Sequence, residues 1–409
     1  MKCRHCATPL RHTFLDLGFA PPSNAYLTAD DLSKPEKYYP LRVKVCDQCW
    51  LVQTEDYAQA DELFNAEYAY FSSTSTTWLA HAKAFTEQVT ARFGLDRDCF
   101  VVEIASNDGY LLKNFVQAGI PCLGIEPTVS TAVAAEQLGI PVLRAFFNEP
   151  LGKQLAAKGK QADLIVGNNV YAHVPDINNF TRGLASALKP NGVITLEFPH
   201  VLRLIEHTQF DTIYHEHFSY LSLGVVTRIF NAARLRVWDV EELSTHGGSL
   251  RVYGCLAGAD WAITDRVATT LALEEDAGLS KLSTYANFQS KADQVKNDLL
   301  SWLIQEKREG RRVAAYGAAA KGNTLLNYAG IKPDLLPYVC DAAPAKQSKY
   351  LPGSHIPIVS PDTLRSEPPD LLLVLPWNLG KEVHQQLFDL EEKGVEFVTA
   401  LPQLTMLNL

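Results

Sequence analysis

The sequence predicts an α/β protein whose main domain is a parallel β-sheet wrapped by helices on both faces. Three observations support this prediction. From residue 100 onward short apolar segments alternate with amphipathic ones, two Cys-x2-Cys pairs stand near the N-terminus, and a second strand-turn-helix pattern begins at Val313. Alternation of this kind is typical of parallel sheets, whose ligands bind at the carboxyl ends of the strands.

Length and composition limit the class of protein. A chain of 409 residues with 47% hydrophobic and 20% charged residues is long enough for two or three domains with cores of their own. The formal net charge of -9, with no run of Lys or Arg, disfavours a nucleic-acid partner. Because no stretch approaches ~20 uninterrupted apolar residues and the N-terminus has no apolar leader, we expect a cytoplasmic protein with no membrane partner.

Half of the eight cysteines are spaced as metal ligands. They form two pairs, Cys3 with Cys6 and Cys46 with Cys49, whereas the other four fall singly inside apolar runs. Two such pairs present four thiolates to one tetrahedral Zn2+, and a small sheet can span the gap between them. Since four sulfur ligands leave no position for water, we expect a structural zinc ion within a module at residues 1–66.

A central domain is expected over residues 67–264. Apolar side chains recur at helical spacing over 72–92, behind a start rich in Ser and Thr. Five short buried strands follow, at 101–104, 123–126, 142–143, 164–166 and 193–196. The loops after these strands should therefore hold the ligands of the domain.

The first of these loops suits an adenosine that carries no phosphate. It runs from Glu103 to Gly109, lacks GxGxxG and starts with an acid, which argues against a pyrophosphate at the helix that opens near Tyr110. Glu126 ends the second strand, where a carboxylate can accept both hydroxyls of a ribose. The alternative is that the two glutamates only end their strands in solvent. The predicted cofactor-binding residues are Glu103, Ala105, Asn107, Gly109, Glu126 and Asn168.

A cluster of polar and aromatic residues lies further along the chain and shows no helical period. Its sequence is Tyr214-His215-Glu216-His217-Phe218-Ser219-Tyr220. If the segment is extended, the two imidazoles share one side and Glu216 lies on the other. A metal site at these three residues is an alternative, but adjacent ligands project oppositely on a strand and no fourth donor is indicated.

The last part of the chain predicts a helical connector at 265–308 and a Rossmann-like domain at 309–409. The strand at Val313 leads through small residues into a helix, where backbone amides and Lys321 favour an anionic group, and Asp341 ends the next strand as a ribose-binding acid would. This pattern suggests NAD, although its GxGxxG is incomplete. The Pro- and Ser-rich stretch 349–369 is expected to be an ordered loop.

Three motifs carry a family resemblance that covers the whole chain. Val-Glu-Ile-x-Ser-Asn-Asp-Gly, Gly-Ile-Glu-Pro and Tyr-His-Glu-His-Phe-Ser-Tyr resemble those of the S-adenosylmethionine-dependent sugar C-methyltransferases of deoxysugar biosynthesis. The resemblance implies an N-terminal zinc module, a central class I methyltransferase domain and a C-terminal Rossmann-like domain. Ala105 stands where the family usually has glycine, and its methyl group should narrow the cofactor site.

Methylation of carbon needs a carbanion equivalent, so the target should lie next to a ketone and a base must remove its proton. The resemblance implies His217 as the base, Glu216 as its partner or as the alternative base, and Tyr214 as a supporting hydrogen-bond group. His173 and Tyr68 complete the implied catalytic set. The expected substrate-binding residues are His246, Gly248, Arg251, Tyr316, Lys321 and Asn378.

The resemblance further implies methylation at C3 of a nucleotide-linked 4-keto-6-deoxysugar, usually thymidine-linked, with S-adenosylmethionine as methyl donor and Zn2+ as a structural ion. One alternative of another class stays open from the residues alone. The chain could be an NAD-linked or non-catalytic nucleotide-sugar-binding protein whose zinc module recruits a partner.

Overall fold

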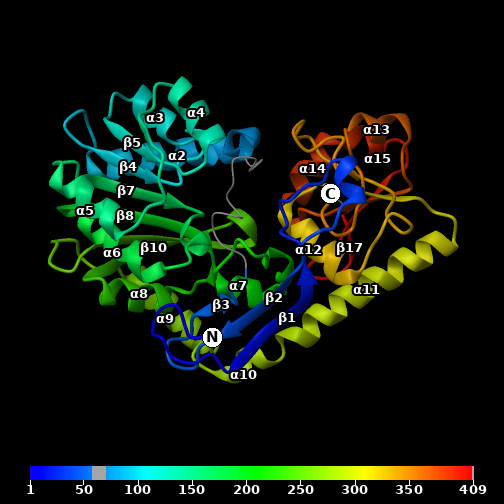
Figure 1. Ribbon diagram of the computed structural model, residues 1–409, viewed down its shortest axis with the longest axis horizontal. Coiled ribbons are helices and arrows are strands. Elements are labelled where there is room, and N and C mark those ends of the chain that lie inside the picture. Colours follow the sequence, from blue (N-terminus) through cyan, green and yellow to red (C-terminus); the bar gives the residue numbers. More distant parts are fainter. Residues whose placement is uncertain (58–70, 408–409) are drawn as a thin grey trace.

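The computed structural model describes residues 1–57 and 71–407, which form a four-stranded, a seven-stranded and a six-stranded sheet. Figure 1 shows the seven-stranded sheet and its helices on one side, the six-stranded sheet on the other, and the strands of the N-terminal module below and between them. None of the helices in the described part of the chain is long and apolar enough to cross a membrane.

The N-terminal module is built on an antiparallel sheet with the order β1-β2-β3-β9. Its strands are β1 (His12–Ala20), β2 (Tyr39–Val45), β3 (Val52–Thr54) and β9 (Ser219–Tyr220). The fourth strand, β9, lies at the end of the polar segment 214–220, which we call the histidine-rich cluster. It follows Thr54 in the chain by more than 160 positions. The zinc module and the cluster therefore share one sheet, which the sequence did not predict.

The seven-stranded sheet confirms the predicted parallel α/β domain. Its strands are β4 (Val101–Ile104), β5 (Cys122–Ile125), β6 (Val142–Leu143), β7 (Ala162–Asn168), β8 (Leu188–Pro199), β10 (Leu235–Leu243) and β11 (Ser249–Leu256). They lie in the order β10-β11-β8-β7-β4-β5-β6, and β4 to β8 are parallel, whereas β11 runs antiparallel to both of its neighbours. The first turn of the domain thus lies near the middle of the sheet, after β4.

The helices of the central unit are α2 (Thr76–Phe93), α3 (Leu112–Gln117), α4 (Val129–Gln137), α5 (Glu149–Ala157), α6 (Ile177–Ala187), α7 (Val201–Glu206) and α8 (Leu223–Ala232). Helix α2 begins later than the predicted residue 72 because the Ser75 hydroxyl caps it by accepting a hydrogen bond from the Trp78 amide. The residues before the cap form the 3-10 turn η2 (Ser72–Thr74).

The connector consists of α9 (Asp265–Asp276), α10 (Leu282–Ala286) and the long α11 (Phe288–Arg308). The six-stranded sheet has the order β14-β13-β12-β15-β16-β17. Its strands are β12 (Val313–Tyr316), β13 (Val339–Cys340), β14 (Ile358–Val359), β15 (Leu371–Val374), β16 (Glu396–Thr399) and β17 (Thr405–Met406). Its helices are α12 (Ala320–Ala329), α13 (Asp362–Ser366), α14 (Gly380–Gln386) and α15 (Phe388–Glu391).

The expected loop at 349–369 is wrong in one respect, because it contains β14 and α13. Ile358 is buried against β13 and Leu364 is fully buried, so these apolar side chains draw the proline-rich stretch onto the sheet.

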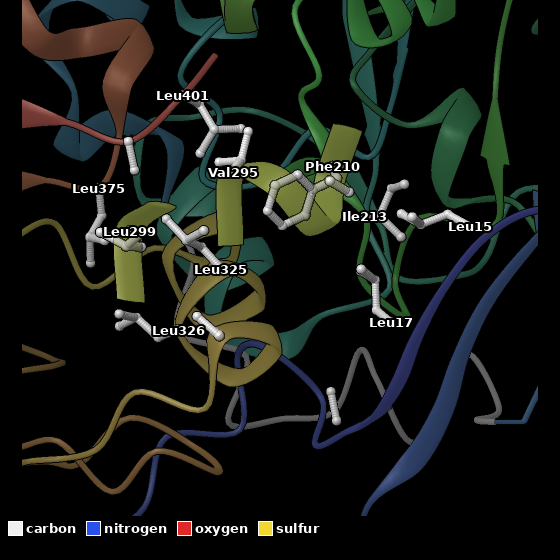
Figure 2. Close-up of a cluster of buried hydrophobic side chains, with 14 of the residues drawn as sticks. Leu15, Leu17, Phe210, Ile213, Val295, Leu299, Leu325, Leu326, Leu375 and Leu401 are labelled. Carbon is white, nitrogen blue, oxygen red and sulfur yellow. The ribbon is translucent and has the colours of Figure 1, made fainter. Parts of the chain in front are cut away.

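One hydrophobic core joins the units. Figure 2 shows side chains from β1, from the segment around Phe210, from α11 and from α12 meeting in one cluster. The cluster brings together Leu15, Phe210, Ile213, Leu299 and Leu325, each at most 1% exposed. The central unit contributes through α7 and the segment around Phe210. Because each unit contributes to the same buried surface, the zinc module, the central unit and the C-terminal unit are expected to hold one arrangement.

Candidate functional site

The four predicted zinc ligands meet at one end of the N-terminal sheet. The sulfur atoms of Cys3, Cys6, Cys46 and Cys49 all lie within 4.8 Å of one another, and the Cys3–Cys49 and Cys6–Cys46 sulfur pairs are 3.5 Å apart. Four thiolates at about 2.3 Å from a tetrahedral zinc ion lie at comparable separations. The donor set therefore fits Zn2+, with Gln53 Nε2 donating to Cys3 Sγ at 3.2 Å as an outer contact.

The same module holds the histidine-rich cluster in place. Strand β3 pairs with β9, the Thr54 hydroxyl donates to the His217 carbonyl at 2.7 Å, and the Thr54 amide donates to the Phe218 carbonyl at 3.2 Å. From the loop after β1, Asn24 Nδ2 donates to both carboxylate oxygens of Glu216, at 2.8 and 2.9 Å. The metal-stapled module thus fixes both backbone and side chain of this cluster.

The loop after β4 has the backbone of a ligand-binding turn. Ala105 and Asn107 adopt left-handed conformations, with φ of 57° and 48°, and Gly109 has a φ of 78°. A Cβ on Gly109 would lie 2.4 Å from Ile140 Cδ1, so this position also needs glycine for space. The amide of Asn107 and that of Thr128 donate to the two oxygens of Glu126, at 2.9 and 2.8 Å, which joins the first and second strand tips.

The polar groups around this loop test whether it fits S-adenosylmethionine. Oε2 of Glu103, Oγ of Ser106, Oδ1 of Asp108 and both side-chain polar atoms of Asn168 are buried without a hydrogen-bond partner in the described part of the chain. Burial, with the charges of Asp108 and Glu126, raises the pKa of Glu103 well above its usual value. Such a group of unpaired donors and acceptors at the ends of β4 and β7 suits a polar ligand that hydrogen-bonds to them, as adenosine and an amino-acid tail can.

Residues 214–217 of the histidine-rich cluster form a turn, so the arrangement considered for an extended segment does not apply. The His217 amide donates to the Tyr214 carbonyl at 2.9 Å, so residues 214–217 reverse direction before β9 begins. His215 consequently packs against Tyr39, with ring centroids 5.9 Å apart, and does not share a side with His217. The alternative of a metal at 215–217 gains no support, because the ligand groups found among residues 1–57 and 71–407 are the four cysteines alone.

The His217 ring lies among other aromatic side chains. Its centroid is 3.9 Å from that of Tyr214 and 4.6 Å from that of His173, which follows β7 in the 3-10 turn η3 (Tyr171–His173). Burial, reinforced by His173, holds the pKa of His217 well below its usual value. Nδ1 donates to the Thr212 carbonyl at 2.7 Å, so Nε2 carries the lone pair of a neutral base.

Glu216 and His173, two neighbours of His217, make hydrogen bonds that bear on their expected roles. Within the described residues no hydrogen bond joins the Glu216 carboxylate to the His217 ring, because the turn directs that carboxylate to Asn24. His173 Nδ1 donates to the Glu216 carbonyl at 2.9 Å, and burial lowers its pKa to about 4, so its Nε2 accepts rather than donates a hydrogen bond. Tyr68, implied as a catalytic residue, lies outside the described residues.

His246 joins the cluster from the turn η5 (Thr245–Gly247). Its Nε2 accepts a hydrogen bond from Asn169 Nδ2 at 3.1 Å, and its ring lies 5.4 Å from that of Trp78 at the start of α2. Burial and the charge of Lys321 lower the pKa of His246 to about 4. No sequence pattern indicated the contacts of Asn169 and Trp78 with His246, because an Asn at a strand end and a Trp on a helix face are both common.

The C-terminal unit adds a cation. Lys321 Nζ donates to Asn378 Oδ1 at 2.7 Å and lies 5.0 Å from the centroid of the Trp377 ring, in the 3-10 turn η6 (Trp377–Leu379) after β15. Trp377 Nε1 donates to Asp211 Oδ2 at 2.8 Å, so the C-terminal unit contacts the segment just before the histidine-rich cluster. The charge of Lys321 also lowers the pKa of His217, after burial and His173. Lys321 and Asn378 are thus brought together as a pair next to the histidines.

Three expected substrate contacts have other places in the structure. The Arg251 guanidinium is 3% exposed and pairs with Glu197 at 3.0 Å, so it neutralises a fully buried acid. Gly248 is required by its turn, where φ is 118° and a Cβ would meet Arg203. Tyr316 packs into a core of the C-terminal sheet with Leu364 and other apolar residues. Burial explains the places of Arg251 and Tyr316, and backbone conformation explains that of Gly248. A sequence pattern does not show which side chains face inward or which turns need glycine.

Known proteins resemble this chain over nearly its whole length. Three family models match the chain: "Putative zinc binding domain" over residues 3–64, "Methyltransferase domain" over 78–240 and "C-methyltransferase C-terminal domain" over 244–402. The chain is 33% identical over 402 residues to C-methyltransferase NovU of Streptomyces niveus, a match that covers 98% of this chain and 96% of that protein.

Solved structures give weaker likenesses. One is magnesium protoporphyrin IX methyltransferase from Synechocystis PCC 6803 with bound SAH, at 14% identity and a TM-score of 0.35, covering 43% of this chain and 82% of that chain. At that TM-score the likeness supports no conclusion about this protein. The match to NovU spans nearly the whole of both chains, and this chain therefore belongs to the family of S-adenosylmethionine-dependent sugar C-methyltransferases.

Proposed function

We propose that this enzyme methylates C3 of a 4-keto-6-deoxysugar that is linked to a thymidine nucleotide, and that His217 is the base. The observation that carries the proposal is the neutral imidazole of His217, whose Nδ1 is engaged by the Thr212 carbonyl and whose Nε2 lone pair is left for a proton. Carbon becomes nucleophilic next to a ketone only after a C–H proton leaves, so a C-methyltransferase needs such a base.

The proposed steps use the residues around His217. Nε2 removes the C3 proton of the sugar, and the C–H electron pair forms the C3–C4 double bond of an enolate while the ketone oxygen becomes negative. Tyr214, whose ring lies against His217, supports this charge by hydrogen bonding. The loop after β4 would hold S-adenosylmethionine, which would supply an electrophilic methyl group for C3 and leave as S-adenosylhomocysteine. His173 accepts a hydrogen bond from a sugar hydroxyl.

The C-terminal unit suits the nucleotide half of the substrate. Lys321 and Asn378 lie at its edge next to the histidines, and an ammonium group there would attract a diphosphate. An NAD-binding role for this unit is not favoured, since Asp341 is paired with Lys346 at 3.2 Å and the Tyr26 hydroxyl donates to Ala318 in the turn after β12. The acid that would hold the adenosine ribose of NAD is therefore already paired with a lysine.

The test measures transfer of a labelled methyl group to a panel of nucleotide-linked sugars. We expect transfer to a 4-keto-6-deoxysugar and none to the same sugar with its ketone reduced, because the reduced sugar has no acidic C3 proton. His217→Ala should bind S-adenosylmethionine normally and lose transfer by roughly 10²- to 10⁴-fold, as removal of a general base does. Transfer to the reduced sugar, or unchanged turnover of His217→Ala, would contradict the proposal.

A parallel variant decides between the two candidate bases. Glu216→Gln keeps an oxygen for Asn24 but cannot accept a proton. If His217 is the base, this variant should lose much less activity than His217→Ala. The reverse order would assign the proton to Glu216.

A further inference from the structure

Asp211 is a buried carboxylate at the contact between the central and C-terminal units. It lies in the 3-10 turn η4 (Phe210–Thr212) and is fully buried. Its Oδ2 accepts a hydrogen bond from Trp377 Nε1 at 2.8 Å, whereas its Oδ1 is buried without a partner among residues 1–57 and 71–407. A half-satisfied acid in the interior is costly and calls for a reason beyond stability.

Trp377, the hydrogen-bond partner of Asp211, also contacts residues on its other sides. Lys321 Nζ lies over the Trp377 ring, and the neighbouring Asn378 accepts from the same ammonium. A Cβ on Gly247 would lie 2.2 Å from Trp377 Cη2, so the ring also touches the turn that carries His246. The Trp377 indole therefore contacts Asp211, Lys321 and the turn η5.

The other end of η4 reaches the proposed base. The carbonyl of Thr212, the residue after Asp211, accepts the hydrogen bond from His217 Nδ1. Thr324 of α12 donates to the Ile213 carbonyl at 2.9 Å, and Phe210 and Ile213 lie in the shared core that Figure 2 shows. The C-terminal unit thus contacts the end of η4, next to the Thr212 carbonyl that determines the tautomer of His217.

We propose that Asp211 is a positioning residue that fixes the base and the cation of the active site relative to each other. Through Trp377 it holds Lys321 and Asn378 of the C-terminal unit, and through the adjoining carbonyl of Thr212 it holds His217. Asp211 itself needs no contact with the substrate. The inference rests on the proposed function insofar as His217 is the base.

A double-mutant cycle on kcat/KM tests this coupling. Asp211→Leu removes the acceptor and Trp377→Phe removes the indole N–H, and each should lower kcat/KM by about 10- to 100-fold, the range for a hydrogen bond to a charged group. Because both variants break the same contact, the double variant should lose little more than either single one. Affinity for S-adenosylmethionine should be unchanged in all three, which a loss of general folding would not allow.

Two further variants make the test specific. Asp211→Asn keeps an oxygen for the indole and should recover part of the lost kcat/KM. Thr77→Val removes the hydrogen bond from Thr77 to Glu382, which also joins the central unit to α14 but is exposed, and it should leave kcat/KM unchanged. Losses that multiply in the double variant, or a Thr77→Val loss equal to that of Asp211→Leu, would overturn the proposal.

Amide hydrogen exchange tests the positioning without any sugar substrate. Residues 210–217 and 377–379 should exchange faster in Asp211→Leu and in Trp377→Phe than in the wild type or in Thr77→Val. Unchanged exchange in these segments would refute the role of Asp211, whatever the substrate is. If the wild type instead methylates no 4-keto sugar while exchange behaves as expected, the proposed function fails and the positioning stands.

Discussion

Three histidines at the site have lowered pKa values and the same protonation state. His173, His217 and His246 are each held below their usual pKa chiefly by burial, and each has one ring nitrogen engaged by a neighbouring carbonyl or amide. Desolvation disfavours the charged imidazolium, so all three are neutral at pH 7. Neutral imidazoles accept protons and hydrogen bonds, which is what enolate formation requires of its base.

This state predicts the pH dependence of turnover. Because the pKa of His217 lies well below 6.5, its neutral form persists as the pH falls through 6.5. The acid limb of kcat/KM, which reports the free enzyme, should therefore lie below pH 6.5. A pH profile with a 4-keto sugar checks this. An acid limb at or above pH 6.5 would show that the base is not buried as described.

Ala105 offers a second prediction at this scale. Its φ of 57° is a conformation that costs an L-residue roughly 1–2 kcal/mol but costs glycine little. After allowing about 0.5–1 kcal/mol for the greater freedom of glycine in the unfolded chain, Ala105→Gly should raise the free energy of unfolding by about 0.5–1 kcal/mol. The smaller residue should also tighten binding of S-adenosylmethionine.

Urea unfolding and a binding titration measure both effects. Ala118→Gly is the matched control, since Ala118 has a φ of -80° and gains nothing from glycine. The control should be destabilised. Equal destabilisation of Ala105→Gly would mean that its backbone is not strained.

Single residues also show where sequence reasoning stops. The cysteine ligands were predictable because their spacing is tied to one chemistry, and Glu126 because strand tips meet at one edge. Arg251 was not, since the same strand pattern fits a substrate contact and a buried pair with Glu197. Asp211 carried no signal, because its partner Trp377 lies 166 positions away in the chain.

At the scale of elements, the pairing of β3 with β9 links the metal-binding module to the histidine-rich cluster. A two-residue strand has no period that sequence can reveal, so this pairing could not be predicted. It makes the zinc module the support of the turn that carries His217, through Thr54 and Asn24. The helices and parallel strands were predictable because their apolar periodicity is local, whereas this contact is not.

Loss of zinc should therefore disturb the active site at a distance. Cys46→Ser is expected to lower the zinc content from about one ion per chain, to speed amide exchange across residues 214–220 and to reduce kcat/KM, since a structural site depends on all four thiolates. Metal analysis and hydrogen exchange give readouts that do not depend on turnover. Cys99→Ser, which removes a thiol outside the ligand set, should retain both zinc and activity. Normal exchange at 214–220 in a zinc-free protein would contradict this link.

At the scale of the whole molecule, three units supply one site. The central domain provides the loop after β4 and His173, the N-terminal module secures the turn with His217, and the C-terminal unit adds Lys321. The hydrophobic core of Figure 2 keeps these units together. The substrate is accordingly proposed to bind where they meet, with its sugar at the histidines and its diphosphate towards Lys321.

Exchange with deuterium oxide measures whether His217 removes the C3 proton of a 4-keto sugar. S-adenosylhomocysteine replaces the methyl donor, so that an enolate can form but no methyl group can be transferred, and deuterium at C3 is followed by NMR. The wild type is predicted to exchange the C3 proton and His217→Asn to exchange it at the uncatalysed rate. Wild-type exchange by His217→Asn would contradict the account.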